Sequence, residues 1–132
     1  MTSLSRPWWW PFGRVPDIAA HELHARLRGS TPPQVIDVRS TLEWRASRIA
    51  GAISVPVTEL KERLSTLGLE QSRPVVAICL SAHRSIPAVR MLRARGIDAC
   101  QLRGGMRAWW AAGLPVQKGP PPAAEPLRST GG

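Results

Sequence analysis

Residues 75–96 read VVAICLSAHRSIPAVRMLRARG, and this stretch decides the fold class of the chain. With Pro74 before them, its first four residues form an apolar run at residues 74–78 that is typical of a buried strand, and Cys79 follows this run directly. A polar loop over residues 79–84 leads into residues 85–94, which we predict to form a helix closed by Gly96. A strand that passes through a short loop into a helix is the repeating unit of α/β domains.

The same alternation runs through the rest of the chain. We predict further strands at residues 34–38, 53–55 and 97–102, and further helices at residues 18–27, 41–47, 57–67 and 106–112. Asp17 is expected to cap the first of these helices with its side chain. Strands that alternate with helices predict an α/β fold, with a mostly parallel sheet flanked by helices on both faces.

The chain length of 132 residues suits one domain. We expect a Trp- and Pro-rich segment at residues 1–13, a single domain at residues 14–117, and a disordered Pro- and Gly-rich tail at residues 118–132. No stretch approaches the roughly 18 apolar residues that a membrane span needs. The start of the chain also lacks the apolar region and cleavage site of a signal peptide. We therefore expect a cytoplasmic protein without a transmembrane segment.

Three consecutive tryptophans, Trp8 to Trp10, stand between Pro7 and Pro11, and these prolines disfavour a helix through the segment. The indoles could cover an apolar patch of the domain or lie at a membrane interface. We favour packing against the domain, because one short aromatic cluster is a weak membrane anchor.

The formal net charge is +9, and arginine supplies most of the positive charge. Six arginines cluster in the second half of the chain: Arg84, Arg90, Arg93, Arg95, Arg103 and Arg107. A basic surface attracts small anions as well as nucleic acid. The chain has no helix-turn-helix motif and no interleaved aromatic motif, so nucleic acid is not expected as a partner and a small anionic substrate is favoured.

Two cysteines, Cys79 and Cys100, are too few for a disulfide framework, and we expect free thiols. His21 and His24 lie three positions apart on a predicted helix, but the sequence offers no third ligand beside them. Two surface side chains are therefore favoured over a metal site. We expect neither a metal nor a cofactor.

Cys79 is the candidate for chemistry because it stands at the carboxyl end of a buried strand, where parallel α/β sheets bind ligands. Loop amides from Leu80 to Arg84 can turn inward as N–H donors, the following helix adds its positive end, and Arg84 adds a full charge. Such surroundings favour the thiolate over the thiol. From the local context alone, a buried structural cysteine before a helix remains the alternative.

Three stretches of the chain, taken in order, resemble the rhodanese-like family over about residues 14–116. They are VIDVRSTLEWRASRIAGAISVPVTEL at residues 35–60, CLSAHRS at residues 79–85 and RGGMRAWWAAGLPV at residues 103–116. The first is similar to a signature that runs from an Asp-x-Arg strand end through an acid-plus-aromatic pair to a Gly-Ala-Ile stretch. The others are similar to the catalytic loop and to the closing GG-x-x-x-W signature.

This resemblance implies a three-layer fold with a five-stranded sheet, and a sulfurtransferase activity. Cys79 would take sulfane sulfur from thiosulfate or a related donor as a persulfide, and pass it to cyanide or a thiol acceptor. Arg84 would hold the sulfonate oxygens of the donor. The remaining loop residues would line the substrate site, with Ser85 also placed to cap the helix: Leu80, Ser81, Ala82, His83 and Ser85.

The resemblance also implies structural support around the site. Asp37, Arg39 and Glu43 match a buried polar cluster, in which we expect an ion pair between Arg39 and Glu43. Gly104 and Gly105 are expected to serve backbone geometry beside the site. Trp109 and Trp110 are expected to pack in the core and at its rim.

Two features depart from the family pattern or add to it. Where many members have a histidine before the Gly-Ala-Ile stretch, this chain has Arg48, which we expect to place another cation near the entrance. Cys100 lies in a strand expected beside the one that ends at Cys79. It could resolve the persulfide as a disulfide, although an inert buried thiol is favoured.

Two rival functions remain open. A phosphatase or arsenate reductase on the same scaffold would have a catalytic loop one residue longer, and the six positions from Cys79 to Arg84 suit the smaller sulfane sulfur better. A persulfide carrier or binding module for a thiolation partner would also need Cys79, and it would hand the sulfur to a protein acceptor.

Overall fold

The computed structural model describes residues 15–81 and 83–121. Five parallel strands form one sheet in the order β1-β5-β4-β2-β3. The strands are β1 (Asp17–Ile18), β2 (Gln34–Asp37), β3 (Ile53–Ser54), β4 (Val75–Ile78) and β5 (Ala99–Leu102). The predicted α/β fold with a parallel sheet is confirmed.

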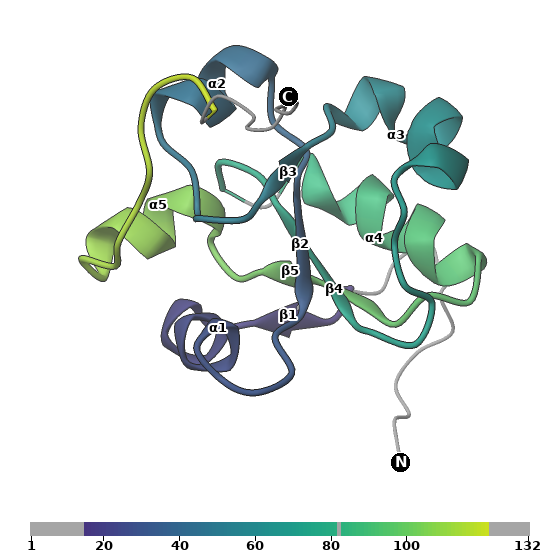
Figure 1. Cartoon of the computed structure of the whole chain (residues 1–132), viewed down its shortest axis with the longest axis horizontal. Coiled ribbons are helices and arrows are strands. Elements are labelled where there is room, and N and C mark those ends of the chain that lie inside the picture. The colour runs from purple at the N-terminus through teal and green to yellow at the C-terminus, as the bar shows by residue number, and fades with distance from the viewer. Residues whose placement is uncertain (1–14, 82, 122–132) are drawn as a thin grey trace, which may run out of the picture.

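Helices cover both faces of this sheet, which gives three layers (Figure 1). The helices are α1 (Ala20–Leu27), α2 (Thr41–Ala46), α3 (Val57–Arg63), α4 (Ser85–Ala94) and α5 (Gly105–Ala111), and the 3-10 turn η1 (Leu64–Thr66) extends α3. Helices α3 and α4 pack on one face, and α1 and α5 pack on the other. The short helix α2 lies beyond the carboxyl ends of the central strands (Figure 1).

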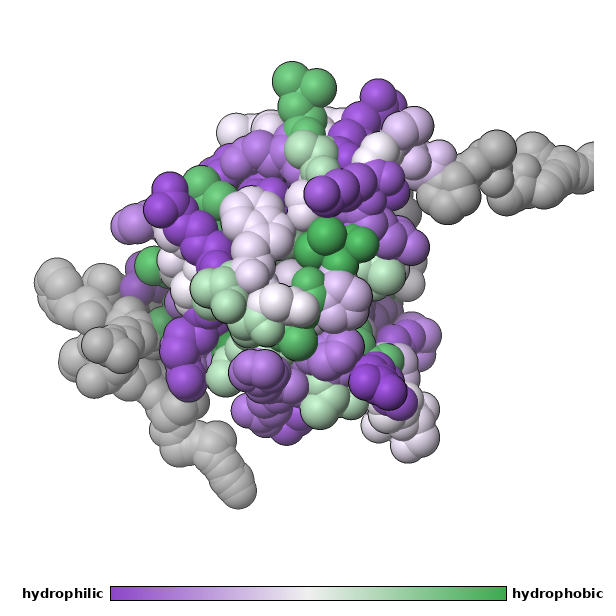
Figure 2. Space-filling model, turned by 90° about the vertical axis from the view of Figure 1, so that its left-hand side faces the viewer, coloured by the Kyte–Doolittle hydropathy of each residue, from purple (hydrophilic) through white to green (hydrophobic). Residues whose placement is uncertain are grey.

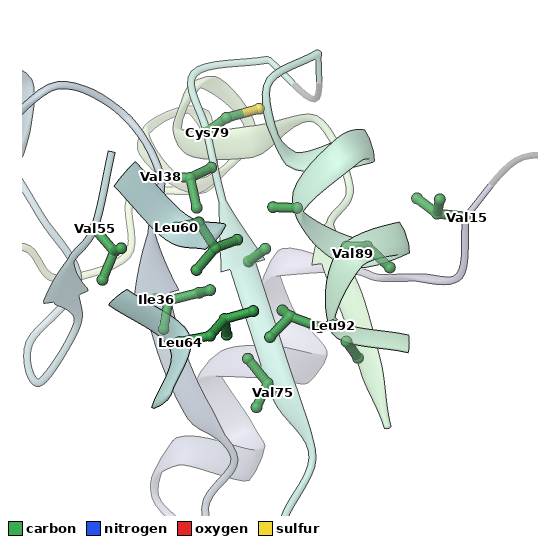
Figure 3. Close-up of a cluster of buried hydrophobic side chains, with 13 residues drawn as sticks. Val15, Ile36, Val38, Val55, Leu60, Leu64, Val75, Cys79, Val89 and Leu92 are labelled. Atoms are coloured by element: carbon green, nitrogen blue, oxygen red, sulfur yellow. The ribbon is translucent and has the colours of Figure 1, made fainter. Parts of the chain in front are cut away.

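Side chains of the central strand β4 alternate between two apolar clusters. Val75 and Ala77 pack with the α3 and α4 face, whereas Val76 and Ile78 pack with the α1 and α5 face. This period of two is the geometry of a strand that is buried on both sides, so every residue of β4 is apolar. Figure 3 shows the first cluster, with Cys79 at the end of its aliphatic side chains.

The start of the domain corrects one expectation. Asp17 lies in the edge strand β1, where it pairs with β5, and it does not cap a helix. Helix α1 begins later, and its N-cap residue Ala19 makes no side-chain cap hydrogen bond. The Asp17 carboxylate instead accepts two hydrogen bonds from Arg103, at 2.9 and 3.2 Å. A two-residue strand has no periodicity of its own, which explains why the sequence pattern did not show it.

The two tryptophans of α5 take the predicted places. Trp109 is buried in the core, and its indole N–H donates to the Pro115 carbonyl at 2.9 Å. Trp110 lies at the rim, where its indole N–H donates to the Ser47 hydroxyl at 3.0 Å. Each polar indole group thus has a partner, which lets the ring pack without an unpaired donor.

The ends of the chain extend past the described residues. Within the described part, Arg48 and Gln117 form an antiparallel bridge, and the Gly119 amide donates to the Arg45 carbonyl at 2.7 Å. The predicted behaviour of Trp8 to Trp10, and of most of the tail at residues 118–132, concerns residues outside those described. Among residues 15–81 and 83–121, no helix has the length and apolarity to cross a bilayer.

Candidate active site around Cys79

Cys79 directly follows β4 at the carboxyl edge of the sheet, and two neighbouring elements hold the loop that it begins. The Val38 amide, just past β2, donates to the Ile78 carbonyl at 2.8 Å. The first turn of α5 donates to the loop itself: the Met106 amide bonds the Cys79 carbonyl at 2.8 Å, and the Arg107 amide bonds the Leu80 carbonyl at 3.0 Å. These bonds use helix N–H groups that have no partner within their own helix.

Gly104 and Gly105 make this close approach of α5 possible. Both have positive φ angles, of 73° and 60°, which side chains other than glycine rarely adopt. A Cβ atom on Gly105 would lie 2.5 Å from the Leu80 carbonyl carbon, well inside van der Waals contact. The expectation that these glycines serve backbone geometry beside the loop therefore has a concrete basis in the structure.

The Cys79 thiol is buried beneath its loop, with 1% of the residue exposed. Its sulfur lies 3.3 Å from the Ser85 hydroxyl at the start of α4. Figure 3 shows the sulfur beyond the aliphatic side chains of the cluster, at the end nearest the loop. The structure therefore leaves very little of this residue accessible to solvent.

Ser85 was expected to cap α4, and the structure gives its hydroxyl a different role. The N-cap position belongs to Arg84, which makes no side-chain cap hydrogen bond, and Ser85 is the first residue of the helix. The Ser85 hydroxyl donates to the Gln101 side-chain carbonyl at 2.5 Å and also contacts Cys79. Both Ser85 and Gln101 are buried, so a polar pair lies behind the thiol.

Arg84, the last residue of the loop, is paired with Glu43 of α2. Its guanidinium donates two hydrogen bonds to the two carboxylate oxygens, at 2.7 and 3.0 Å. This pairing lowers the pKa of Glu43 to about 2, against the opposing effect of burial. The same hydrogen bonds raise the pKa of Arg84, and the nearby Cys79 adds to that increase.

Glu43 is itself fixed by the start of its helix. The Ser40 hydroxyl accepts from the Glu43 amide at 3.2 Å, and the Ser40 amide donates to the Glu43 carboxylate at 3.0 Å. This capping box holds the Glu43 carboxylate in the orientation in which it accepts from Arg84. The Ser-x-x-Glu spacing was visible in the sequence, although the sequence interpretation did not use it.

The expected ion pair between Arg39 and Glu43 does not form. Arg39 instead donates to both oxygens of Asp37, at 2.9 and 2.7 Å, and to the Ser47 carbonyl at 2.7 Å. Asp37 and Arg39 are both buried. Asp37 lies two positions before Arg39 along an extended backbone, so it is a nearer partner for Arg39 than Glu43 is. This bidentate pair joins the end of β2 to the end of α2 and so supports the helix that carries Glu43.

Of the other predicted loop residues, Leu80, Ser81 and His83 are described. Ser81 is partly buried and His83 is exposed, and the Ser81 hydroxyl lies 3.2 Å from His83 Nδ1. Leu80 is partly buried and contributes its carbonyl to the bond with α5. Ala82 is outside the described residues.

Arg48 does not place a cation at the entrance. The residue is only 3% exposed, and its guanidinium lies 4.2 Å from the centre of the Trp44 ring. It also donates to the Gly119 carbonyl at 2.7 Å and to the Trp44 carbonyl at 3.3 Å. A charge with these partners holds the C-terminal segment against α2 and is not offered to a substrate.

Cys100 lies on the opposite face of the sheet from Cys79. It is level with Val76 in the β4–β5 pairing, and it packs with the cluster under α1 and α5. Three residues of strand separate it from the level of Cys79, which is about 10 Å along the sheet. A disulfide spans at most about 7 Å between Cα atoms, so these two thiols cannot join in this fold. Burial raises the pKa of Cys100 to about 12, in keeping with the inert thiol that we favoured.

A cavity of about 640 Å³ lies away from this site. It is bounded mainly by α1, the connection from α2 to β3, and the segments at residues 67–73 and 115–117. Figure 2 shows the side of the molecule toward α1 and α5, where apolar residues lie between hydrophilic ones. Cys79 and Arg84 are not among the residues that line the cavity, so its volume says nothing about the chemistry at the thiol.

The sequence interpretation missed Gln101 as a member of the site. A signal was present, because Gln101 is a polar residue within the apolar strand predicted at residues 97–102. Ala99 and Gln101 share one strand face, so a polar side chain there points toward α4 rather than toward solvent. Among the described residues, no group of three or more His, Cys, Asp or Glu side chains could hold a metal ion.

Comparisons with known proteins agree with this architecture. The model of the rhodanese-like domain matches residues 19–112. A protein named sulfurtransferase from Allochromatium vinosum is 31% identical over 77% of this chain and 94% of its own length. An HTH-type transcriptional regulator of Mycobacterium tuberculosis, Rv0324, is 39% identical over 73% of this chain, which spans only 42% of that regulator.

Among solved structures, a rhodanese-related protein from Thermoplasma volcanium superposes with a TM-score of 0.69. It is 31% identical, and the match covers 77% of this chain and 97% of that one. The parallel sheet, the cysteine loop after its central strand and these matches lead to one conclusion. The chain belongs to the rhodanese-like domain family, whose members include proteins named as sulfurtransferases.

Proposed function

We propose that this protein transfers sulfane sulfur from thiosulfate or a related donor to cyanide or a thiol acceptor, with Cys79 as the carrier. One observation carries the proposal: the Cys79 thiol stands at the carboxyl end of the central strand, under a loop that ends at Arg84 and opens α4. Ligands of parallel α/β sheets bind at this edge, next to a helix N-terminus.

The reaction divides into two displacements at sulfur. The Cys79 thiolate attacks the outer sulfur of thiosulfate, so a new S–S bond forms while the old S–S bond breaks and sulfite leaves with the electron pair. The product is a Cys79 persulfide. Cyanide then attacks its outer sulfur, thiocyanate leaves, and the thiolate is restored. A thiolate acceptor would become a persulfide in the same way.

Access to the sulfur sets a condition on this chemistry. Because 1% of Cys79 is exposed, a donor must reach the thiol past the residues of its own loop. In the described part of the loop, His83 is exposed, and Leu80, Ser81 and Arg84 are partly buried. We propose that these residues, together with Ala82, form the walls of the donor site.

The test compares thiocyanate formation from thiosulfate and cyanide in three forms of the full chain. Cys79→Ser should abolish the reaction, because a hydroxyl cannot hold the persulfide. Cys100→Ser is the matched control, since it removes the other thiol from the far face of the sheet, and it should retain wild-type turnover. Turnover that survives Cys79→Ser would remove the basis of the proposal.

A second candidate function is a persulfide carrier that serves a protein acceptor. The observation in its favour is the pairing of Arg84 with Glu43, which compensates the charge that would otherwise hold a sulfonate. A persulfide donor or a protein thiol places less demand on that cation. Slow thiocyanate formation combined with fast transfer of sulfur from the loaded protein to a dithiol would support the carrier.

The phosphatase alternative is tested with the same preparations. The loop from Cys79 to Arg84 spans six positions, one fewer than we expect for a phosphatase or arsenate reductase on this scaffold. We expect no hydrolysis of p-nitrophenyl phosphate.

A reducing cytoplasm would suit the proposed function, because it would keep Cys79 free of disulfides between turnovers.

A further inference from the structure

We propose that Gln101 is a positioning residue that decides, through the Ser85 hydroxyl, how readily Cys79 becomes a thiolate. This inference rests on the proposed role of Cys79 as the nucleophile. Gln101 lies on β5, and its side chain is linked to the reacting sulfur through the Ser85 hydroxyl.

Three buried groups form a chain from one strand to the next. The Cys79 sulfur lies 3.3 Å from the Ser85 oxygen, which lies 2.5 Å from the Gln101 side-chain carbonyl. The exposed fractions of Cys79, Ser85 and Gln101 are 1%, 0% and 8%, so these contacts are shielded from bulk solvent. Shielding makes the direction of each hydrogen bond matter more than it does at a surface.

A proton count shows which form of Cys79 this arrangement favours. A serine hydroxyl has one proton, and here Ser85 donates it to the Gln101 carbonyl oxygen. The Ser85 oxygen can then face the sulfur only as an acceptor, so the contact is made by the Cys79 S–H as donor. The observed orientation of Gln101 thus stabilises the thiol.

Rotation of the Gln101 carboxamide reverses the direction of both hydrogen bonds. With the amide nitrogen toward Ser85, Gln101 donates to the hydroxyl oxygen, and the hydroxyl proton turns to the sulfur. That arrangement stabilises the thiolate, and the thiol proton departs to solvent. No proton passes from one of the three groups to another, because only the orientations of the amide and the hydroxyl change. An amide offers both a donor and an acceptor, which glutamate and methionine do not.

Charged groups around Cys79 act on its thiol independently of the hydrogen bonds through Ser85. They are His83 and Arg84 in its own loop, Asp37 and Arg39 at the end of β2, Glu43 on α2, and Arg107 on α5. None of them is changed by a substitution at Gln101. A shift that needs Ser85 can therefore be separated from a shift caused by charge alone.

The test titrates the Cys79 thiolate by its ultraviolet absorbance, against the Cys79→Ser protein as blank and without any sulfur donor. Gln101→Glu presents only acceptors once ionised, so it should hold the Ser85 proton and raise the titration midpoint by about one pH unit. Gln101→Met releases that proton to the sulfur and should lower the midpoint by about half a unit. Each unit is a tenfold change in the thiolate-to-thiol ratio.

The decisive comparison repeats both substitutions in Ser85→Ala. The Gln101→Met shift should then fall below about a third of a unit, since the link to the sulfur is gone, whereas the charge of Gln101→Glu still acts on the sulfur directly and should keep part of its shift. Gln34→Glu is the matched control: Gln34 lies on β2 and bonds residues 70 and 73 away from the thiol, so it should leave the midpoint unchanged. Shifts of the same sign for glutamate and methionine, or a Gln101→Met shift that persists without Ser85, would overturn the inference. The proposed function is judged separately by thiocyanate formation.

Discussion

The Arg84 guanidinium makes two hydrogen bonds to the two oxygens of the Glu43 carboxylate, of 2.7 and 3.0 Å. The two residues are 41 positions apart, and their contact ties the loop that begins at Cys79 to α2. The side chains remain partly exposed, at 37% and 33%, so this is a well-oriented pair near the surface rather than a fully buried one. The pair links Arg84, the charged residue that ends the Cys79 loop, to helix α2.

Glu43→Gln should improve the use of thiosulfate. The substitution removes the negative charge that compensates Arg84, and the free guanidinium can then hold the anionic donor. We expect the KM for thiosulfate to fall about fivefold, which corresponds to roughly 1 kcal/mol for a partly exposed charge. Steady-state kinetics at low ionic strength measure this. Glu59→Gln, which changes a surface carboxylate paired with Arg63, should leave the KM unchanged.

The same pair predicts how stability responds to acid. The folded protein lowers the pKa of Glu43 from 4.5 to about 2, so the unfolded chain binds this proton more readily. The stabilisation is complete above pH 4.5 and is lost as the pH falls toward 2. Denaturant unfolding at pH 6 and pH 3 should show a smaller loss of stability for Glu43→Gln than for the unsubstituted protein. An equal loss in both would contradict this.

Gly105→Ala should disrupt the loop that begins at Cys79. The added Cβ would overlap the Leu80 backbone, and the positive φ angle adds strain. We expect a loss of more than about 2 kcal/mol in stability, with sulfur transfer reduced further, because α5 must withdraw from the Cys79 carbonyl. Gly113→Ala is the control: it also has a positive φ angle but meets no atom within 4 Å, so it should cost less. Similar losses for both would show that backbone strain alone matters.

Asp37→Ala should be the most damaging of the carboxylate substitutions. It leaves the buried Arg39 guanidinium without its bidentate partner, and breaking one side of a buried pair costs about 3–5 kcal/mol. Glu22→Ala breaks an exposed pair with Arg26 and should cost less than about 0.5 kcal/mol. Urea unfolding of the two variants gives the comparison, and comparable losses would show that the buried pair is not special.

The sequence was sufficient for the layer structure because long apolar runs and helix periods are local signals. The strands predicted at residues 34–38 and 74–78 and the helix predicted at residues 85–94 could be located from their own residues, and the position of Cys79 followed from them. The first edge strand could not be located, because Asp17 and Ile18 gain their conformation from pairing with β5.

The partners of the polar residues were harder to predict than the elements that carry them. Arg39 and Arg84 both had acids within reach, and only the packing of α2 against the loop decides which acid each one meets. The contact between Ser85 and Gln101 likewise depends on the placement of α4 over β5. Side-chain pairing between distant segments is a property of the assembled fold, and a local pattern does not contain it.

The placement of Cys79 and Cys100 on opposite faces of the sheet limits how the proposed cycle can end. A layer of backbone stands between the two sulfurs, so a loaded Cys79 has no second thiol of its own chain on its side of that barrier. Discharge would then depend on an external nucleophile, and the lifetime of the loaded state would be set by the supply of that molecule. In a cell that lacks it, the protein would act as a reservoir of reactive sulfur.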